Sequence, residues 1–388
     1  MRGKAVTFFH RMIQALGPAM LPATTVCLPT LLTPCTAKDT EIVVQLLNKL
    51  MIEFGPAVSA LIDRLYGCVT DKYMSLFAAL DSDLLGSAHA QLTPADSAGG
   101  GRVGVSSSSG SINSCGDGSS SSRARRAGSA APKFEAERLS LQKQYVDFLQ
   151  HIALHGCHGA LSASACGNDC RVQAMLTAVL SAVNGGSAGT GATGSGGGLE
   201  EQSGLPAGHV APVSLPLRKS AVCTLIGLVQ VWSPNAPHSP TSGVEPTRPA
   251  VASTPVPSIL TQMFSSLLYD EALPILFAML CGRDVSGSNV HSFSSGSGRH
   301  GVRAGLDMKD ADANSFITDI GCLLWAIVTV RGSAEISSFL QHMIMPRLGW
   351  SQDAVAFLCQ LLAQPGPQGT FKESFKSFVK NLYSSMNS

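Results

Sequence analysis

The chain has 388 residues, with 27 basic and 26 acidic side chains and a net charge of +1. Hydrophobic residues make up 45% of it and charged residues only 14%, well below the roughly 25% typical of a globular domain. Because 39 glycines and several serine runs fill the difference, folded and low-complexity sequence alternate along the chain. The balanced charge excludes a nucleic-acid binder that works by bulk positive charge, so any such contact must be local.

Residues 1–80 form the first predicted helical block. Apolar residues recur there at helical spacing, and Gly17-Pro18 ends the first helix. A short helix follows around residues 23–32, which Pro29 and Pro34 are expected to limit. Two longer amphipathic helices then flank Gly55-Pro56, which predicts a helical hairpin.

Further helical blocks are predicted over residues 134–183, 213–281 and 308–388. The block 213–281 contains a Pro-rich linker, and Pro274 should kink or split its last helix. Ser/Gly-rich segments 81–133, 184–212 and 282–307 separate the blocks. Since these segments bury too little apolar surface to offset the entropy of ordering, they are predicted to be disordered insertions.

No block shows a sustained alternation with a period of two, so no sheet is expected. Many helices of similar length, arranged as hairpins, are typical of a solenoid of the HEAT type, in which each repeat is a helix pair. We therefore predict an all-α fold, a HEAT-type helical-repeat solenoid that carries Ser/Gly-rich insertions between its hairpins.

The chain offers no catalytic or nucleotide-binding pattern, so an enzyme, a cofactor and a metal are not expected. Potential zinc ligands do gather in one stretch: His155, Cys157, His158, Cys166 and Cys170. They lack the paired C-x-x-C spacing of a structural zinc site, which favours a purely structural role. Most of the 11 cysteines lie in apolar helical sequence, which indicates a reducing, intracellular compartment.

The C-terminal helix carries two parallel rows of side chains. One row is aromatic and the other is basic: Phe371, Phe375 and Phe378, and Lys372, Lys376 and Lys380. The simpler interpretation is a solvated face beside a core stripe. The functional alternative is a row of ammonium groups about 6 Å apart that follows a phosphate backbone. Two other basic pairs are interpreted as ordinary surface: Arg138 with Lys143, and Arg218 with Lys219.

The longest strongly apolar stretch, residues 322–330, is about half of the ~20 residues needed to cross a bilayer. No membrane-spanning helix is expected. The N-terminal residues interrupt their apolar run with His10 and Arg11, so a secretory signal is not expected either.

Several blocks, in this order, resemble the exportin-T family of tRNA exportins in the importin-β superfamily. They are Phe9-His10-Arg11-Met12-Ile13 with Leu16-Gly17-Pro18 and Leu21-Pro22, Tyr145-x-x-Phe148-Leu149-Gln150, Leu225-x-x-Leu228-Val229-x-x-Trp232, Arg331-Gly332 with Phe339-Leu340-Gln341, Leu348, and the stretch from Phe357 through Pro365 to Phe371-Lys372 and Phe375. No single block is diagnostic, and the Ser/Gly segments have no counterpart. The resemblance therefore rests on order and spacing.

The resemblance implies a carrier that binds tRNA with Ran-GTP, contacts nuclear pore proteins and shuttles between nucleus and cytoplasm as a monomer. It covers the C-terminal portion of such an exportin, so the N-terminal Ran-binding repeats are expected to be absent from this sequence. We accordingly expect weak tRNA binding that Ran-GTP does not tighten. The alternative from another class is a generic HEAT-repeat scaffold that binds proteins and no RNA.

Overall fold

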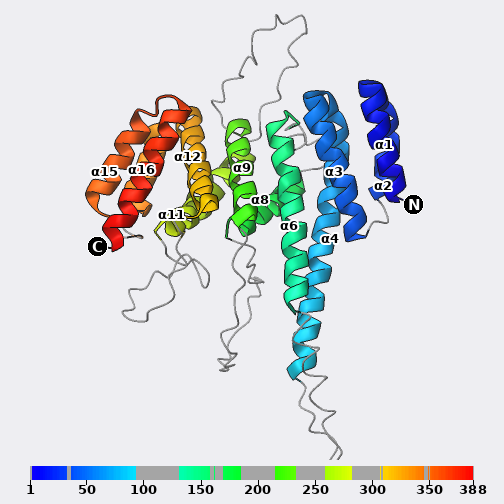
Figure 1. The fold of residues 1–388 in the computed structure, drawn as a ribbon, viewed down its shortest axis with the longest axis horizontal. Helices are drawn as coiled ribbons and strands as arrows, with labels where there is room; N and C mark the ends of the chain where they lie inside the picture. Colours follow the sequence, from blue (N-terminus) through cyan, green and yellow to red (C-terminus); the bar gives the residue numbers. More distant parts are fainter. Residues whose placement is uncertain are drawn as a thin grey trace, which may run out of the picture.

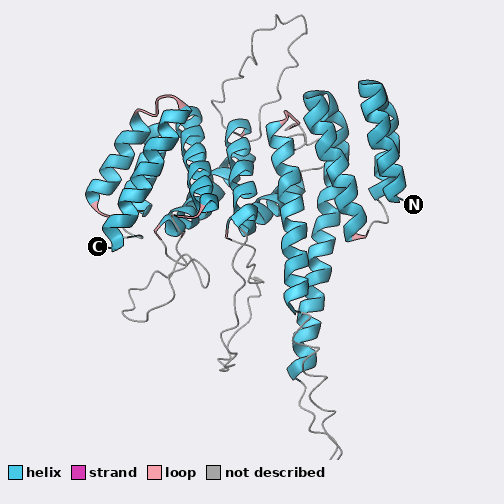
Figure 2. Cartoon of the chain, viewed as in Figure 1, coloured by secondary structure: helices cyan, strands magenta, loops and turns pink. Residues whose placement is uncertain are grey.

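The computed structural model describes residues 2–32, 36–92, 131–157, 161, 169–184, 215–232, 258–281, 306, 309–344, 348 and 350–387. Every regular element within these ranges is a helix (Figure 2). The helices stand side by side in a row that runs from the N-terminus to the C-terminus (Figure 1). The predicted all-α class is therefore confirmed for the part of the chain that the structure describes.

The helices have the following bounds. The N-terminal half contains α1 (Arg2–Leu16), α2 (Leu21–Leu32), α3 (Ala37–Phe54), α4 (Ser59–Leu92), α6 (Ala131–Leu154) and α8 (Asp169–Val183). The C-terminal half contains α9 (Leu215–Val231), α10 (Ser258–Ser266), α11 (Leu273–Leu280), α12 (Ala311–Arg331), α13 (Ser333–Phe339), α15 (Gln352–Ala363) and α16 (Gln368–Asn387). Two π-helical segments, Leu267–Ala272 and Leu340–Ile344, join α10 to α11 and continue α13.

The contacts between helices define two layers. In the first layer α1, α3, α6, α9, α12 and α16 each pack against the next helix of that layer. In the second layer α2 contacts α4, α4 contacts α8, α8 contacts the π segment before α11, and α13 contacts α15. Contacts of α3 with α4, α6 with α8, α12 with α13 and α15 with α16 join the layers. Apolar stripes of both layers meet between them and form one continuous core.

Glycines mark the predicted breaks between helices. Gly55 has a φ of 50° and opens the short 3-10 turn Gly55–Val58 between α3 and α4. Gly332 has a φ of 89° and separates α12 from α13. Since L side chains rarely adopt such angles, glycine suits both positions. Pro274 lies in the first turn of α11, directly after the π segment, so the hydrogen-bond pattern changes just before the proline while the chain stays helical and is not split in two.

Helix α2 ends at Leu32, as predicted, but Pro29 lies inside it and does not limit it, because its packing on α3 and α4 supports the helix across the proline. One predicted boundary is wrong: helix α4 continues to Leu92 rather than ending at residue 80. Asp81, predicted to begin a disordered insertion, instead pairs with Arg138 of α6 at 3.0 Å. The remainder of the three predicted insertions lies almost wholly outside the described residues.

Helices α6 and α9 approach each other closely. A Cβ atom built on Gly227 would lie 2.5 Å from the Cβ of Ala153, which is too short for two carbon atoms in contact. The absence of a side chain at Gly227 therefore lets the two helix backbones come together. Beyond this contact, the buried ring of Trp232 packs edge-on against Phe264, with 5.4 Å between the ring centroids.

Four helical segments are long and apolar enough to cross a membrane by length and composition alone: Gly3–Leu32, Ala37–Asp83, Thr261–Leu280 and Ala311–Arg331. In the last two, 72% and 61% of the most apolar window is buried against protein, which accounts for their apolar character without lipid. In Gly3–Leu32 only 22% is buried. The expectation that the chain inserts into no membrane stays a prediction.

Candidate functional site

A row of polar side chains crosses the first layer from helix to helix. We call this row the polar ladder. Its members are Glu41 and Gln45 on α3, Lys143, Gln144 and Asp147 on α6, Lys219 and Cys223 on α9, Ser315, Asp319 and Cys322 on α12, and Lys372 on α16. Within each helix these positions are spaced by three or four residues, except that Lys143 and Gln144 are adjacent and lie four and three residues before Asp147, so the positions of each helix lie on one side of it.

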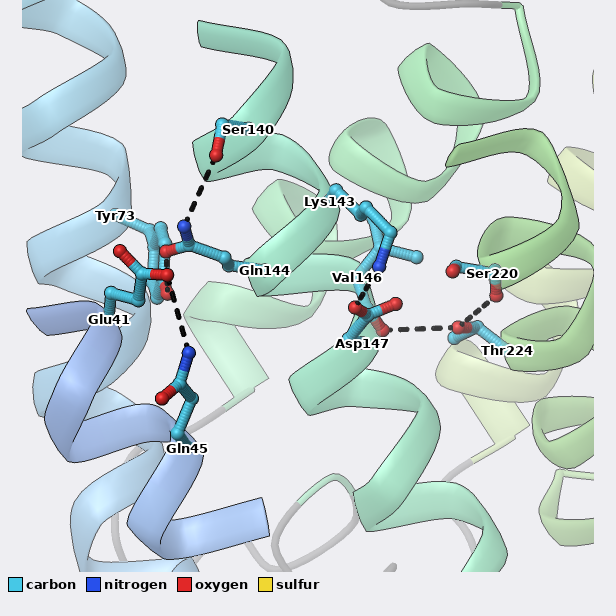
Figure 3. Close-up of polar contacts among 10 residues, drawn as sticks. All are labelled: Glu41, Gln45, Tyr73, Ser140, Lys143, Gln144, Val146, Asp147, Ser220 and Thr224. Carbon is cyan, nitrogen blue, oxygen red and sulfur yellow. Dashed lines mark hydrogen bonds and ion pairs between the residues drawn. The ribbon is translucent and has the colours of Figure 1, made fainter. Parts of the chain in front are cut away.

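The first part of the ladder spans α3 and α6 (Figure 3). Gln45 donates from Nε2 to Glu41 Oε1 at 3.3 Å. The Tyr73 hydroxyl of α4 donates to Gln144 Oε1 at 3.4 Å. Burial, with the charges of Glu41 and Asp147, raises the pKa of Tyr73 well above its ordinary value, so this phenol stays a neutral donor.

On α6 the ladder carries an ion pair. Lys143 Nζ lies 2.6 Å from Asp147 Oδ2, one helical turn away (Figure 3). Beside it the buried Thr224 hydroxyl of α9 lies 3.3 Å from the carbonyl oxygen of Val146 and 2.9 Å from that of Ser220. These contacts fix α9 against α6 at the level of the ion pair.

The next contacts join α9 to α12. Lys219 Nζ donates to Ser315 Oγ at 2.8 Å. Burial raises the pKa of the Cys223 thiol to about 11, and the charge of Asp319 adds to the rise. Cys223 is therefore a neutral thiol at physiological pH and a poor nucleophile.

Asp319 of α12 is a partly buried carboxyl of the ladder. Its Oδ2 is buried and has no hydrogen-bond partner among the described residues. Burial raises the pKa of the Asp319 carboxyl, while the positive charges of Lys219 and Lys372 lower it. Lys372 also opposes the rise that burial causes in the pKa of Cys322. The positive charges of Lys219 on α9 and Lys372 on α16 thus act on the Asp319 carboxyl of α12 from both neighbouring helices.

The structure divides the predicted lysine row. Lys372 lies toward Asp319 and Cys322 of α12 and is only partly exposed, as is Lys376, whereas Lys380 is exposed. The aromatic row on the same helix is buried, as its spacing predicts: Phe371, Phe375 and Phe378. The three lysines therefore do not form one uniform solvent-facing row.

Of the five potential zinc ligands only His155 and Cys157 have described side chains, and among the described residues no group of three His, Cys, Asp or Glu side chains could hold a metal. Cys157 is buried with its Sγ 3.4 Å from the carbonyl oxygen of Gly55, and burial raises the pKa of its thiol to about 11. The ring of His155 stacks on His151. His158 and Cys166 lie outside the described residues, and so does the side chain of Cys170.

Sequence reasoning missed most of the ladder. It assigned Lys143 and Lys219 to ordinary surface and gave no role to Asp319. A signal was present, because Lys219 with Cys223 and Ser315 with Asp319 are polar pairs four residues apart in apolar helices. That signal places each pair on a face but does not say which helices adjoin.

In charge, the ladder is balanced. It contains three carboxylates and three ammonium groups that alternate along it: Glu41, Lys143, Asp147, Lys219, Asp319 and Lys372. Such a surface suits recognition by many weak polar contacts. Comparison with protein-family models, with curated proteins and with solved structures finds no match to this chain.

Proposed function

We propose that this chain is a HEAT-type helical-repeat carrier that takes part in the export of tRNA from the nucleus with Ran-GTP. One observation carries the proposal: the residue blocks that resemble the exportin-T family coincide with the breaks and core contacts of the two-layer helix array. Such positions are the ones that a shared fold constrains most strongly.

The coincidence can be followed along the chain. Gly17 opens the 3-10 turn between α1 and α2 with a φ of 55°. Trp232, at the end of another block, is buried against Phe264. Arg331-Gly332 contains the break between α12 and α13, and Phe375 packs against Gly321 of α12. These residues of the resembling blocks thus lie where helix pairs turn and stack.

The layered contacts favour the HEAT-type description. Each layer advances by one helix at a time, and consecutive helices alternate between layers for most of the chain. In a solenoid of this kind every repeat contacts only its neighbours, and the long face that results binds extended partners.

The second candidate, a scaffold that binds proteins and no RNA, is favoured by the balance of the polar ladder. Lys143 is paired with Asp147, and the positive charge of Lys372 acts on the Asp319 carboxyl. A phosphate backbone would have to compete with these carboxylates. A protein partner that offers charges of both signs would not.

A tRNA titration at several salt concentrations, with and without Ran-GTP, separates the two functions. We expect weak tRNA binding that Ran-GTP does not tighten, with a slope of log affinity against log salt of about 0.7–0.9 per phosphate contacted. A Lys372→Ala, Lys376→Ala, Lys380→Ala variant should have a smaller slope. The charge-matched control is Lys72→Ala, Lys133→Ala, Lys309→Ala, whose lysines lie on other helices or before α12.

Two outcomes would count against tRNA export. Complete absence of tRNA binding at low salt would favour the protein scaffold. An equal loss of slope in the row variant and in the control would show that only net charge matters. Strong Ran-dependent binding would contradict the expectation drawn from the coverage of the resemblance.

A further inference from the structure

Two histidines lie one turn apart at the C-terminal end of α6. His151 and His155 are four residues apart, so they share one face of the helix. Their rings face each other, with 5.4 Å between the ring centroids and 21° between the ring planes. Both residues are partly exposed, whereas Ile152 and Ala153 between them are buried. We call His151 and His155 the histidine pair.

The helix end that carries the histidine pair is held in place by the turn that follows it. Gly156 has a φ of 72°, and the amide of Cys157 donates to the carbonyl oxygen of Ile152 at 3.2 Å, which is the Schellman ending of a helix. The Sγ atom of Cys157 lies 3.4 Å from the carbonyl oxygen of Gly55, between α3 and α4. The backbone beneath the two imidazoles is therefore fixed, as a preorganised binding site requires.

The imidazole of His151 is suited to bind a metal. Its Nδ1 atom has no hydrogen-bond partner among the described residues, so no protein group competes with a ligand for this nitrogen. Burial lowers the pKa of His151 and the neighbouring His155 lowers it further, while Asp147 opposes the change. His151 is therefore a neutral imidazole at physiological pH, which is the form that metals bind.

The separation of the two rings fits one small cation. An ion bound to a ring nitrogen at about 2.1 Å lies about 3.2 Å from the centroid of that ring. Two rings whose centroids are 5.4 Å apart then subtend roughly 115° at the ion, close to the tetrahedral angle of zinc. The rings must turn about χ2 to aim their nitrogens at the ion, and this torsion is soft in histidine. The helix itself need not move.

We propose that the histidine pair binds a Zn²⁺ ion through one nitrogen of each imidazole. Imidazole is a preferred ligand of zinc, whereas Ca²⁺ and Mg²⁺ take oxygen ligands. The last turn of a helix carries a partial negative charge, which also favours a cation there. No group of three His, Cys, Asp or Glu side chains could hold a metal among the described residues, so the other two positions are left to water. The inference is independent of the proposed function, because it uses neither the lysine row nor tRNA.

Two neighbouring groups are not ligands. Asp147 lies one turn before His151, but its carboxylate is held by Lys143 at 2.6 Å. Cys157 points to Gly55, and burial raises the pKa of its thiol to about 11, so the thiolate that zinc needs is scarce at physiological pH. The site therefore differs from the one weighed in the sequence, which did not include His151.

The test titrates the full chain with Zn²⁺ and, as a control, with Mg²⁺. Since the chain contains other histidines and cysteines, binding at the pair is followed by NMR of histidine labelled with carbon-13 in the ring. We expect the ring signals of His151 and His155 to shift together at the same Zn²⁺ concentration, and Mg²⁺ to shift neither. Amide exchange in the last turn of α6 should slow when Zn²⁺ is bound.

Three variants sharpen the test. His151→Ala should weaken Zn²⁺ binding at His155 at least ~10-fold, because one imidazole alone cannot chelate the ion. Gln150→His with His151→Gln keeps the number of histidines but sets the two imidazoles five residues and about 140° apart around the helix, so it should weaken binding as much. His10→Ala with His342→Ala removes two histidines of other helical segments and should leave the affinity unchanged. Circular dichroism should show unchanged helicity in each variant, because all four positions are at least partly exposed.

Several results would overturn the proposal. A Zn²⁺ affinity at His155 that stays unchanged in the spacing variant would show that the two rings do not act together. A shift of only one ring in the wild type would show the same without any variant. Zinc binding that survives His151→Ala but is abolished when thiols are blocked with N-ethylmaleimide would assign the metal to cysteines.

Discussion

Replacing Gly227 by alanine tests how closely α6 and α9 are packed. The new methyl carbon would lie 2.5 Å from Ala153 Cβ, about 1 Å inside the contact distance of two carbon atoms. Neither methyl group can rotate away, so the helix backbones must separate. We expect overpacking to cost about 3 kcal/mol, offset by about 1 kcal/mol from the better helix propensity of alanine. The expected net loss is about 2 kcal/mol.

The exchange variant, Gly227→Ala with Ala153→Gly, isolates this contact. It moves the methyl group from α6 to α9 and leaves one methyl group in the gap. The propensity terms cancel because one helix gains what the other loses. We therefore expect the exchange variant to unfold within about 1 kcal/mol of the wild type, although Ala153→Gly alone costs about 1 kcal/mol.

Urea unfolding followed by circular dichroism measures the loss, and amide hydrogen exchange in α6 and α9 locates it. Location matters because arrays of stacked helices need not unfold in one step. A Gly227→Ala chain as stable as the wild type would refute the close approach. An exchange variant as unstable as Gly227→Ala would show that Ala153 is not the group that the new methyl meets.

Three further predictions concern buried polar groups. Tyr145→Phe should lower the free energy of unfolding by about 1–3 kcal/mol, because Thr70 Oγ1 then lacks the buried hydroxyl that lies 3.2 Å from it. The double variant Tyr145→Phe with Thr70→Val should recover most of this loss. Urea unfolding measures both variants. Iodoacetamide at pH 8 should modify the exposed Cys68 far faster than the buried Cys157, whose pKa of about 11 leaves about one thiolate per thousand, as mass spectrometry can show. Burial raises the pKa of Asp319, so its neutral form stabilises the fold below the ordinary carboxyl pKa and this stability is lost as the pH rises through the raised value. Asp319→Asn should therefore gain stability relative to the wild type between pH 4 and pH 7, and an equal difference at both pH values would contradict that cause.

Periodicity and helix breakers predicted most of the described helices. The helix ends at Gly55-Pro56 and at Gly332 were predictable because glycine readily adopts the positive φ that each break requires. Pro29 was expected to limit α2 but lies inside it, since the packing of α2 on α3 and α4 offsets the hydrogen bond that the proline removes. Helix α4 also continues past its predicted end. Its ion pair with α6 at Asp81 lies beyond the apolar stripe from which the end was predicted, so the stripe alone could not show it.

The polar ladder was beyond sequence reasoning for a different cause. Lys219 and Ser315 are 96 residues apart in the chain, and their contact depends on α9 lying next to α12. Because they are so far apart in sequence, no local rule relates the faces of the two helices. Spacing within one helix predicts a face, whereas adjacency between helices comes only from the packed core.

The distribution of charge limits how tRNA could be held. The chain carries +1 in total and residues 1–38 carry +4, so residues 39–388 carry −3. The field over most of the chain therefore does not attract a polyanion at long range. Contact would depend on the lysine row, in which Lys372 is partly exposed and its charge already acts on the Asp319 carboxyl. Lys376 and Lys380 are then the two ammonium groups most able to meet phosphates. Two such contacts correspond to a decrease of about 1.4–1.8 in the slope of log affinity against log salt when all three lysines are replaced. A decrease near zero would favour a scaffold that binds proteins and no RNA.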